Sequence, residues 1–253
     1  MAKLNLKAIK TDKELVRIAK FDLEGETLRE VMESIIESDE TSRVLSKAGV
    51  GYVIEHGYFG IPRNSTAGAD IEHLGIEIKT CSLKRLKSGK LTVKEPISLN
   101  IINYKEEYKN DDIRNSSLFK KNKKILFICY IQDKGLPRSE YIIKYVFLLE
   151  MDDEVINEIK DDYKMILDYI KRGDAHNIHQ RQHKYLTLCP KHSGTFKDST
   201  CRKSKTTQPF NQSAAEIRAF RFKHQYMLKI IRRYLAKENP EILDEFKEEK
   251  ISN

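Results

Sequence analysis

The amino-acid sequence predicts an α/β fold in which one mixed sheet is flanked by helices. Short apolar runs such as Ile125–Ile131 indicate strands, and longer segments with apolar residues at helical spacing, such as Asp152–Lys171, indicate helices. No stretch rich in Pro, Gly or Ser separates these elements. We therefore expect one domain over residues 1–236, followed by an acidic tail over 237–253.

The expected elements follow one another along the chain. Thr11 is a plausible N-cap for a first helix through Lys20, and Thr27-Leu-Arg-Glu30 has the capping-box pattern of a second, which runs through Ile36. A third helix is expected over Ser46–Tyr58. The remaining segments are strands at Leu74–Thr80, Ile97–Tyr104, Ile125–Ile131, Ile142–Leu149 and Tyr185–Leu188, and helices at Asp152–Lys171 and Lys223–Ala236.

Composition excludes several classes of protein. Hydrophobic residues make up 40% of the chain, too many for a disordered protein. No apolar run approaches the roughly 20 residues of a membrane span, and the first residues lack the apolar core of a secretion signal. Four cysteines are too few for a disulfide scaffold. We expect a cytoplasmic protein with reduced thiols and no membrane partner.

The segment from Ala67 to Lys79 holds the candidate catalytic residues. Leu74, Ile76 and Ile78 alternate with Gly75, Glu77 and Lys79, so a strand would direct Glu77 and Lys79 to the same side. Asp70 can return to this position through the turn before the strand. Two carboxylates can bind a hard divalent cation, and a neighbouring lysine can orient or deprotonate a water. This set suits the hydrolysis of a phosphodiester.

A Glu-x-Lys tripeptide alone carries almost no weight, because the chain contains four other copies. We interpret those copies as solvated charge on helices or tails; they begin at Glu107, Glu158, Glu245 and Glu248. The copy at Glu77 differs because it has β alternation, a glycine-bearing turn before it and Asp70 at a suitable spacing.

Positive charge is concentrated in one segment. Residues 171–235 contain 15 Lys and Arg against three Asp and Glu, whereas the rest of the chain has a net charge of −4. Five of the seven histidines also lie there. A basic segment in an otherwise nearly neutral chain favours the binding of a polyanion. Nucleic acid is the favoured polyanion, because a site that hydrolyses phosphodiesters needs a phosphate substrate. The alternative is a basic surface that serves only solubility.

Several stretches together resemble the MutH family of mismatch-repair nicking endonucleases, and still more the type II restriction endonucleases that cut GATC and share the MutH domain. The order and spacing of these stretches are more specific than any one of them. They are Gly49–Glu55 with Tyr58–Gly60, Asp70 with Gly75–Lys79, Lys84–Lys90, Leu99–Tyr104, Asn115–Asn122 and Arg218–Tyr226.

The resemblance implies a PD-(D/E)xK nuclease core, dependence on Mg²⁺ and cleavage of double-stranded DNA at GATC. It makes Asp70 and Glu77 metal ligands, and it gives Lys79 the task of positioning the attacking water. Glu55 would complete the site, although an exposed helix carboxylate is the alternative. Lys121 matches a residue that reaches the scissile phosphate, with solvated charge in a lysine-rich run as the alternative.

The resemblance also implies how bases are read. Lys191 follows Pro190 where the family reads bases from a Pro-Lys loop, and lysine can donate to guanine O6 and N7. The family has arginine where Cys189 stands, and a tyrosine near the methylated adenine where Arg221 stands, so discrimination by methylation is not implied. We expect the recognition segment at about 185–235 to contact DNA, also through Arg202, Lys203, Arg221 and Lys223.

Two minor interpretations concern the basic segment. Four residues with zinc-binding side chains lie there without the spacing of a common zinc finger: His183, Cys189, His192 and Cys201. Four phenylalanines among the basic residues can stack or wedge against bases: Phe196, Phe210, Phe220 and Phe222. Phe220 and Phe222 alternate like residues of a core strand, which favours burial for that pair.

The sequence thus predicts a type II restriction endonuclease. A MutH-type nickase and a DNA-binding module with an unused active site are the alternatives, and the intact set of Asp70, Glu77 and Lys79 favours an enzyme. One catalytic centre reaches one strand of a palindrome, so we expect a monomer in solution that pairs on DNA or cuts the strands in turn.

Overall fold

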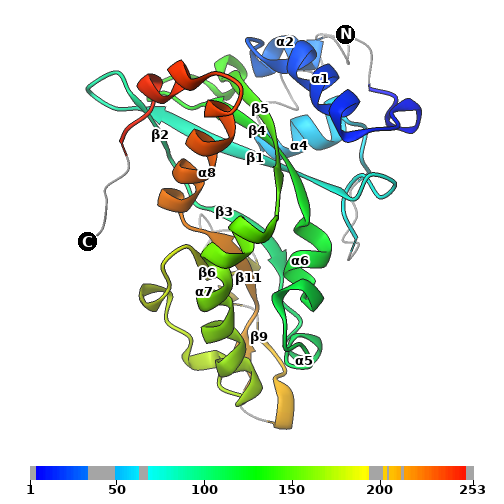
Figure 1. The fold of residues 1–253 in the computed structure, drawn as a ribbon, viewed down its shortest axis with the longest axis vertical. Coiled ribbons are helices and arrows are strands. Elements are labelled where there is room, and N and C mark those ends of the chain that lie inside the picture. The colour runs from blue at the N-terminus through cyan, green and yellow to red at the C-terminus, as the bar shows by residue number, and fades with distance from the viewer. Residues whose placement is uncertain are drawn as a thin grey trace. The chain divides into compact units, whose positions relative to one another are not determined.

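The computed structural model describes residues 4–33, 49–62, 68–193, 202–203, 205–211 and 214–248. The chain divides into two compact units. Unit 1 comprises Met1–Glu95, Lys124–Leu149 and Leu228–Asn253, and unit 2 comprises Pro96–Lys123 and Glu150–Met227. The predicted α/β class with a mixed sheet and flanking helices is confirmed (Figure 1). The domain boundary at residue 236 stays a prediction.

Unit 1 contains a four-stranded sheet in the order β2-β1-β4-β5. The sheet is mixed, because β1 pairs in parallel with β4 and antiparallel with β2. The parallel register places Glu77 beside Ile125 and Lys79 beside Phe127. The strands are β1 (Ile76–Arg85), β2 (Leu91–Val93), β4 (Lys124–Ile131) and β5 (Ile142–Glu150).

The helices of unit 1 begin where the sequence offers caps. Thr11 accepts a hydrogen bond from the Glu14 amide, and the reciprocal bonds between Thr27 and Glu30 complete the predicted capping box. The helices are α1 (Asp12–Leu23), α2 (Leu28–Glu33), α4 (Val50–Tyr52), which continues as a π-helical turn (Val53–Tyr58), and, from Leu228 onward, α8 (His224–Ala236).

The two faces of this sheet have different neighbours. Ile76 and Ile78 belong to a core cluster with residues of α1, α2 and α4. Because side chains alternate along a strand, Glu77 and Lys79 lie on the opposite face of β1. On β5, Phe147 contacts Tyr234 of α8 at a centroid distance of 5.9 Å. Figure 1 shows the helices from the N-terminal segments and α8 on different sides of these strands.

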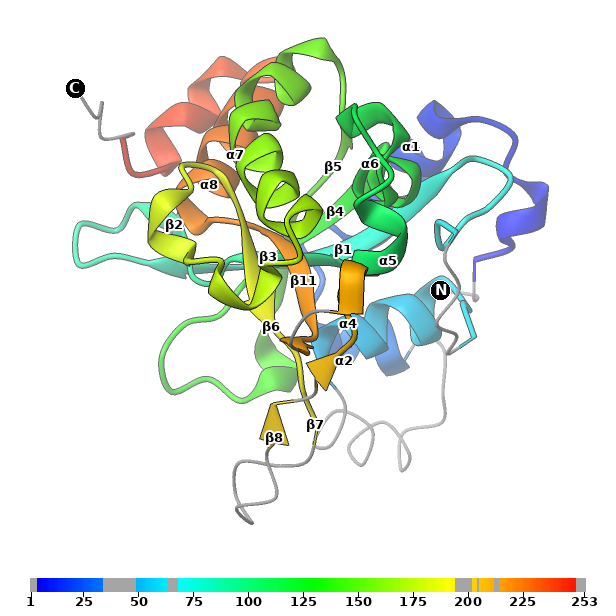
Figure 2. The same ribbon diagram turned by 90° about the horizontal axis from the view of Figure 1, so that it is seen from below.

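Unit 2 contains an antiparallel sheet in the order β3-β11-β6. Phe220 of β11 is buried and contacts Tyr163 of α7 at 6.1 Å, so α7 covers one face of this sheet (Figure 2). The elements are β3 (Ile97–Ile101), α5 (Tyr104–Glu107), α6 (Ser117–Asn122), α7 (Asp153–Lys171), β6 (Leu186–Pro190) and β11 (Arg218–Phe222). Short two-residue strands β7 to β10 fall within 192–216.

Several predicted bounds differ from the structure. The strand expected from Leu74 begins at Ile76, since Gly75 has φ +65° and forms the preceding turn. The strand expected to reach Tyr104 ends at Ile101, because Asn103 caps α5 by accepting a hydrogen bond from the Lys105 amide. Strand β2 and helices α5 and α6 were not predicted, and β11 was indicated only by the alternation of Phe220 and Phe222. Residues 34–36 and 46–48 of two expected helices lie outside the described residues.

Part of the acidic C-terminal tail packs onto unit 1. Residues Pro240–Glu245 form a 3₁₀ helix, and Phe246 is fully buried beside Leu91. The Tyr145 hydroxyl donates a 2.7 Å hydrogen bond to Glu245. Burial and this bond anchor this part of the tail to the rest of the unit. Among the described residues, no helix is both long and apolar enough to cross a membrane.

Candidate active site and nucleic-acid interface

A tight turn brings Asp70 back to the strand that follows it. Ile71 and Ile76 exchange backbone hydrogen bonds of 2.9 and 3.2 Å, and Gly75 supplies the positive φ that this short loop requires. The Asp70 Oδ2 atom then accepts a 2.9 Å hydrogen bond from the amide of Ile78. The return predicted from the glycine-bearing turn is thus present, and the Asp70 carboxylate lies against the backbone between Glu77 and Lys79.

Glu77 and Lys79 form a close ion pair on β1. The Lys79 ammonium donates to Glu77 Oε1 at 2.5 Å. The Glu77 side chain is only 3% exposed, while that of Lys79 is 20% exposed. The carboxylate is therefore fixed inside the protein, and the ammonium can still reach solvent. The structure brings Asp70, Glu77 and Lys79 together at one point of the strand, as the alternation predicted.

The donor chemistry of this point fits a hard divalent cation. The Asp70 carboxylate lies on the amide of Ile78, and Glu77 is the residue before it in the strand. Mg²⁺ is usually held by one or two carboxylates together with water and substrate phosphate. In the part of the chain that the structure describes, no group of three or more His, Cys, Asp or Glu side chains is arranged to hold a metal. The fit is therefore that of a two-carboxylate site which a phosphate completes.

Glu55 lies on the side of β1 that faces α4. A Cβ atom added to Gly51 would be 3.4 Å from Glu55 Oε1 and 3.7 Å from Thr80 Oγ1, so both side chains approach the same glycine. Thr80 alternates with Lys79 and occupies the opposite face of the strand. Glu55 thus does not join Asp70 and Glu77 in a three-carboxylate cluster here, and its role in completing the site stays a prediction.

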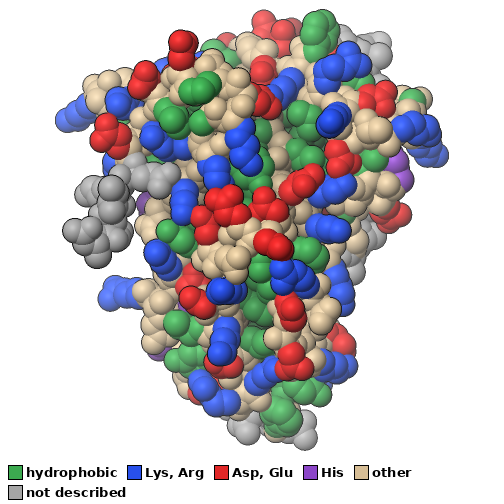
Figure 3. Space-filling model, viewed as in Figure 1, with side chains coloured by type: hydrophobic (Ala, Val, Ile, Leu, Met, Phe, Trp, Pro, Cys, Tyr) green, Lys and Arg blue, Asp and Glu red, His purple; other side chains and the backbone are tan. Residues whose placement is uncertain are grey.

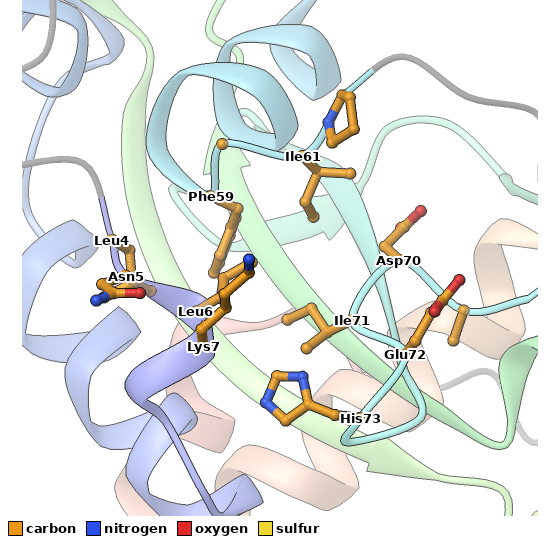
Figure 4. Close-up of a pocket in the computed structure, with 13 residues that line it drawn as sticks. Leu4, Asn5, Leu6, Lys7, Phe59, Ile61, Asp70, Ile71, Glu72 and His73 are labelled. Carbon is orange, nitrogen blue, oxygen red and sulfur yellow. The ribbon is translucent and has the colours of Figure 1, made fainter.

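A cavity of about 430 Å³ borders Asp70 within unit 1. Residues 4–7, 59–62 and 69–73 form its walls (Figure 4). His73 also contacts the N-terminal segment just beyond the first wall, because its Nε2 atom lies 3.0 Å from the carbonyl oxygen of Ile9. The labelled side chains of Lys7, Asp70 and Glu72 give the cavity polar groups of both signs. Asp70 is therefore accessible from a space large enough for part of a substrate.

Lys121 lies in unit 2, on α6, and its side chain is partly exposed. Ser116 caps this helix by accepting a 3.0 Å hydrogen bond from the Phe119 amide. Because Lys121 and the Asp70 site belong to different units, its approach to the scissile phosphate stays a prediction.

The predicted base-reading lysine is held by a residue that the sequence interpretation missed. Lys191 directly follows β6, and its ammonium donates a 2.7 Å hydrogen bond to Ser98 Oγ of β3. Ser98 Oγ also lies 3.6 Å from the sulfur of Cys189. The run Ile97-Ser-Leu-Asn-Ile101 alternates apolar and polar residues, and this alternation was the available signal for Ser98.

The other predicted DNA contacts are spread along the same unit. Arg221 is in register with both Ser98 and Thr187, so these three side chains form one row across the sheet. The ammonium of Lys223 donates to the carbonyl oxygen of His183, which gives Lys223 a structural partner. Arg202 and Lys203 form strand β8, which pairs with β7 (His192–Ser193). Contact of these residues with DNA stays a prediction.

The minor zinc interpretation finds no support among the described residues. His183 is buried, its Nδ1 atom lies 3.0 Å from Thr187 Oγ1, and burial lowers the pKa of its imidazole, with Lys223 acting in the same direction and Asp162 opposing. Cys189 packs beside Ser98. Cys201 lies outside the described residues.

The four phenylalanines of the basic segment differ in exposure. Phe220 and Phe222 are fully buried, so the core interpretation favoured by their alternation is confirmed. Phe210 is 64% exposed. Phe196 lies outside the described residues.

Surface charge does not separate cleanly on the face shown in Figure 3. Lys and Arg side chains are interspersed there with Asp and Glu. No large area of a single charge is therefore visible among the described side chains on this face.

Comparisons with known proteins find similarity to a mismatch-repair enzyme family and to a restriction enzyme. Residues 59–162, which include Asp70, Glu77 and Lys79, match the family model described as DNA mismatch repair enzyme MutH. The chain is 36% identical over 192 residues to the type II restriction enzyme Sau3AI of Staphylococcus aureus. That alignment covers 75% of this chain and 37% of the relative, so the chain spans little more than a third of that enzyme's length.

Two mismatch-repair proteins are more distant relatives. The chain is 27% identical over 174 residues to the DNA mismatch repair protein MutH of Shewanella woodyi, covering 67% of this chain and 71% of the relative. It is also 27% identical to the MutH protein of Buchnera aphidicola, covering 66% of this chain and 74% of the relative. The resemblance to MutH-like endonucleases seen in the sequence is thereby confirmed.

Proposed function

We propose that the chain is a type II restriction endonuclease of the MutH-like family, and that it hydrolyses double-stranded DNA at GATC with Mg²⁺. The observation that carries the proposal is the convergence of Asp70, Glu77 and Lys79 on one stretch of β1. Each member of the group has a distinct task in phosphodiester hydrolysis.

Asp70 and Glu77 would hold the divalent cation. The amide of Ile78 orients one oxygen of Asp70, and the other oxygen of that carboxylate remains available as a ligand. Glu77 is fixed by burial and by Lys79, so its carboxylate needs little reorganisation when a cation binds. The cation would supply electrostatic stabilisation of charge on the phosphoryl group.

Lys79 would position the water that attacks phosphorus. Its ammonium is anchored by Glu77 at 2.5 Å and retains further N–H donors directed away from that carboxylate. A hydrogen bond from Nζ holds the water oxygen beside the scissile phosphate, and a second can stabilise a phosphoryl oxygen. As the water oxygen bonds to phosphorus and the ester P–O bond breaks, the water gives up a proton, the departing ester oxygen takes one up from solvent, and the positive charge of Lys79 offsets the charge on the phosphoryl oxygens.

Recognition would come from the polar row on the sheet of unit 2. Ser98 holds the Lys191 ammonium at 2.7 Å, which limits the directions that this donor can take. An oriented lysine distinguishes guanine by donating to O6 and N7 in the major groove. Lys191→Ala should reduce discrimination between GATC and altered sites by about 1–3 kcal/mol, measured as a ratio of dissociation constants. Equal weakening on every sequence would make Lys191 a phosphate contact instead.

The catalytic assignment is tested by plasmid cleavage. With Mg²⁺, the wild-type protein should cut unmethylated plasmid, and EDTA should abolish cleavage. Lys79→Ala and Asp70→Ala should lower the rate by at least about 100-fold, the usual scale for a positioned acid–base group, while DNA binding persists. Lys84→Ala is the matched control, because Lys84 is an exposed lysine on the same strand. Full cleavage by either site variant refutes the assignment.

A MutH-type nickase is the second candidate, and the alignments with two mismatch-repair proteins favour keeping it. The same assay separates the two, since a restriction enzyme ends at linear fragments and a nickase accumulates open circles. Comparing unmethylated with adenine-methylated plasmid then tests sensitivity to methylation. Specific binding without any cleavage would indicate the third possibility, a DNA-binding module with an unused site.

A further inference from the structure

Phe210 has an exposed side chain and a backbone conformation that core packing does not explain. It is a bulky apolar side chain that remains 64% exposed. Its backbone has φ 60° and ψ 27°, in the left-handed region. Among the described residues it is the only non-glycine residue with positive φ. Single exposed apolar residues are ordinary, but a phenylalanine in this backbone conformation is not, because its Cβ is crowded there.

The loop that carries Phe210 is anchored rather than loose. Gln208 is 1% exposed, its Oε1 atom accepts a 2.7 Å hydrogen bond from the amide of Ala175, and its Nε2 atom lies 3.0 Å from Nδ1 of His176. Pro209 restricts the backbone immediately before the aromatic residue. The strained conformation therefore follows directly after an anchored residue, and anchoring by the surroundings is the condition under which such strain persists.

A second aromatic ring fixes the direction of the phenyl group. The ring of Tyr108, which directly follows α5, meets Phe210 edge to face at a centroid distance of 5.7 Å. Both ribbon views show the segment after β9 (Lys205–Thr206) beside α5 (Figures 1 and 2). One edge of the phenyl ring is supported, and most of its surface faces solvent.

The surrounding charge indicates what this ring meets. Phe210 follows a run in which Arg202, Lys203 and Lys205 occur within four residues without an acidic residue. An exposed aromatic ring that follows basic residues in the chain suits nucleic acid, because phosphates pair with cations while a base stacks on the ring or the ring wedges between base pairs. A protein partner would leave the clustered positive charge without a role.

We propose that Phe210 is a DNA-contacting wedge that stacks on a base when the protein binds its duplex. The proposal rests on the proposed function and adds a contact to it. The loop holds the ring in the stacking orientation before DNA arrives, so little side-chain freedom is lost on binding. The positive φ is unfavourable for the backbone of Phe210, but it places the ring in this orientation.

Binding to a GATC duplex in EDTA, which prevents cleavage, tests the proposal. Phe210→Ala should raise the dissociation constant by about 5- to 150-fold, the range of base–aromatic stacking. Phe210→Tyr keeps the ring and should stay within about twofold of wild type on the same basis. Phe21→Ala is the matched control, because Phe21 on α1 is 90% exposed and lies outside the basic segment. Equal effects of Phe210→Ala and Phe21→Ala overturn the proposal.

Two further readouts separate a DNA wedge from a merely structural ring. A 2-aminopurine placed across the site should change its fluorescence on binding wild type and not on binding Phe210→Ala. Phe210→Gly should bind DNA weakly yet unfold at a higher urea concentration, since glycine accepts a positive φ without strain. Unchanged DNA affinity of Phe210→Ala together with lost self-association would assign the ring to contact with a second copy, against the proposal. If wild type does not bind DNA, the proposed function fails as well.

Discussion

Asp162 is a buried carboxylate that organises the start of β6. Its two oxygens accept hydrogen bonds from the amides of Lys184, Tyr185 and Leu186 at 2.7, 2.6 and 2.8 Å. Asp162→Asn replaces one acceptor oxygen by a donor that faces amide donors. We expect a loss of about 1–3 kcal/mol in the free energy of unfolding, measured by urea denaturation. Asp161→Asn, an exposed neighbour, should change little, and equal effects would contradict the role of Asp162.

His183 should make stability fall in acid. Burial, aided by Lys223 and opposed by Asp162, lowers the pKa of its imidazole below the ordinary value. The unfolded chain therefore binds the proton more readily, and the free energy of unfolding declines as the pH drops below about 6.5 toward the folded-state pKa.

Urea midpoints at pH 8 and pH 5 measure this contribution. In His183→Gln the difference between the two midpoints should be smaller than in wild type, because the shifted group is gone. His179→Gln removes an exposed histidine and should leave the difference intact. An unaltered difference in His183→Gln would assign the acid sensitivity to other groups.

At the scale of elements, we expect the turn before β1 to position Asp70 in the proposed site. Gly75 and Gly89 both have positive φ, +65° and +80°, and a Cβ at either would meet no atom within 4 Å. Alanine at either position should cost about 1–2 kcal/mol of unfolding free energy, because the only penalty is the left-handed backbone. The two variants can therefore be matched in stability.

Their catalytic effects should differ. Gly75 lies in the loop that returns Asp70 to Ile78, whereas Gly89 lies in the turn between β1 and β2. Gly75→Ala should reduce plasmid cleavage, and Gly89→Ala should retain it at temperatures where both variants are folded. Asparagine tolerates a positive φ, so Gly75→Asn should recover part of the activity. Equal activities of the two alanine variants would show that the turn does not position Asp70.

Local patterns predicted the elements that follow local rules. The caps at Thr11 and Thr27 and the alternation of Glu77 with Lys79 depend on near neighbours, and all three are present in the structure. Strand β11 was indicated only by the alternation of Phe220 and Phe222, because its pairing with β3 and β6 joins residues far apart in sequence. The bond from Lys191 to Ser98 was missed because these two residues are also far apart in sequence.

At the scale of the whole molecule, the one proposed catalytic centre has to cleave two DNA strands. The chain carries one set of Asp70, Glu77 and Lys79, and a palindromic site presents two scissile phosphates. We expect a monomer in free solution that pairs on cognate DNA or cuts the strands successively. Supercoiled plasmid should pass through open circles, and the rate should rise faster than linearly with protein concentration. A tight dimer without DNA that yields linear product directly would contradict this expectation.

The interleaving of the two units has a consequence for synthesis in the cell. Strand β1 pairs with β4, and Leu91 of the neighbouring strand β2 forms a β-bridge with Phe246. Unit 1 therefore needs residues from three distant parts of the chain. At about 5–20 residues per second, the ribosome takes roughly 10 to 30 s to proceed from Lys79 to Phe246. During that interval the nascent chain exposes unpaired strand edges. Unit 1 is therefore completed only after translation of its last segment, and chaperones have time to bind its strands beforehand.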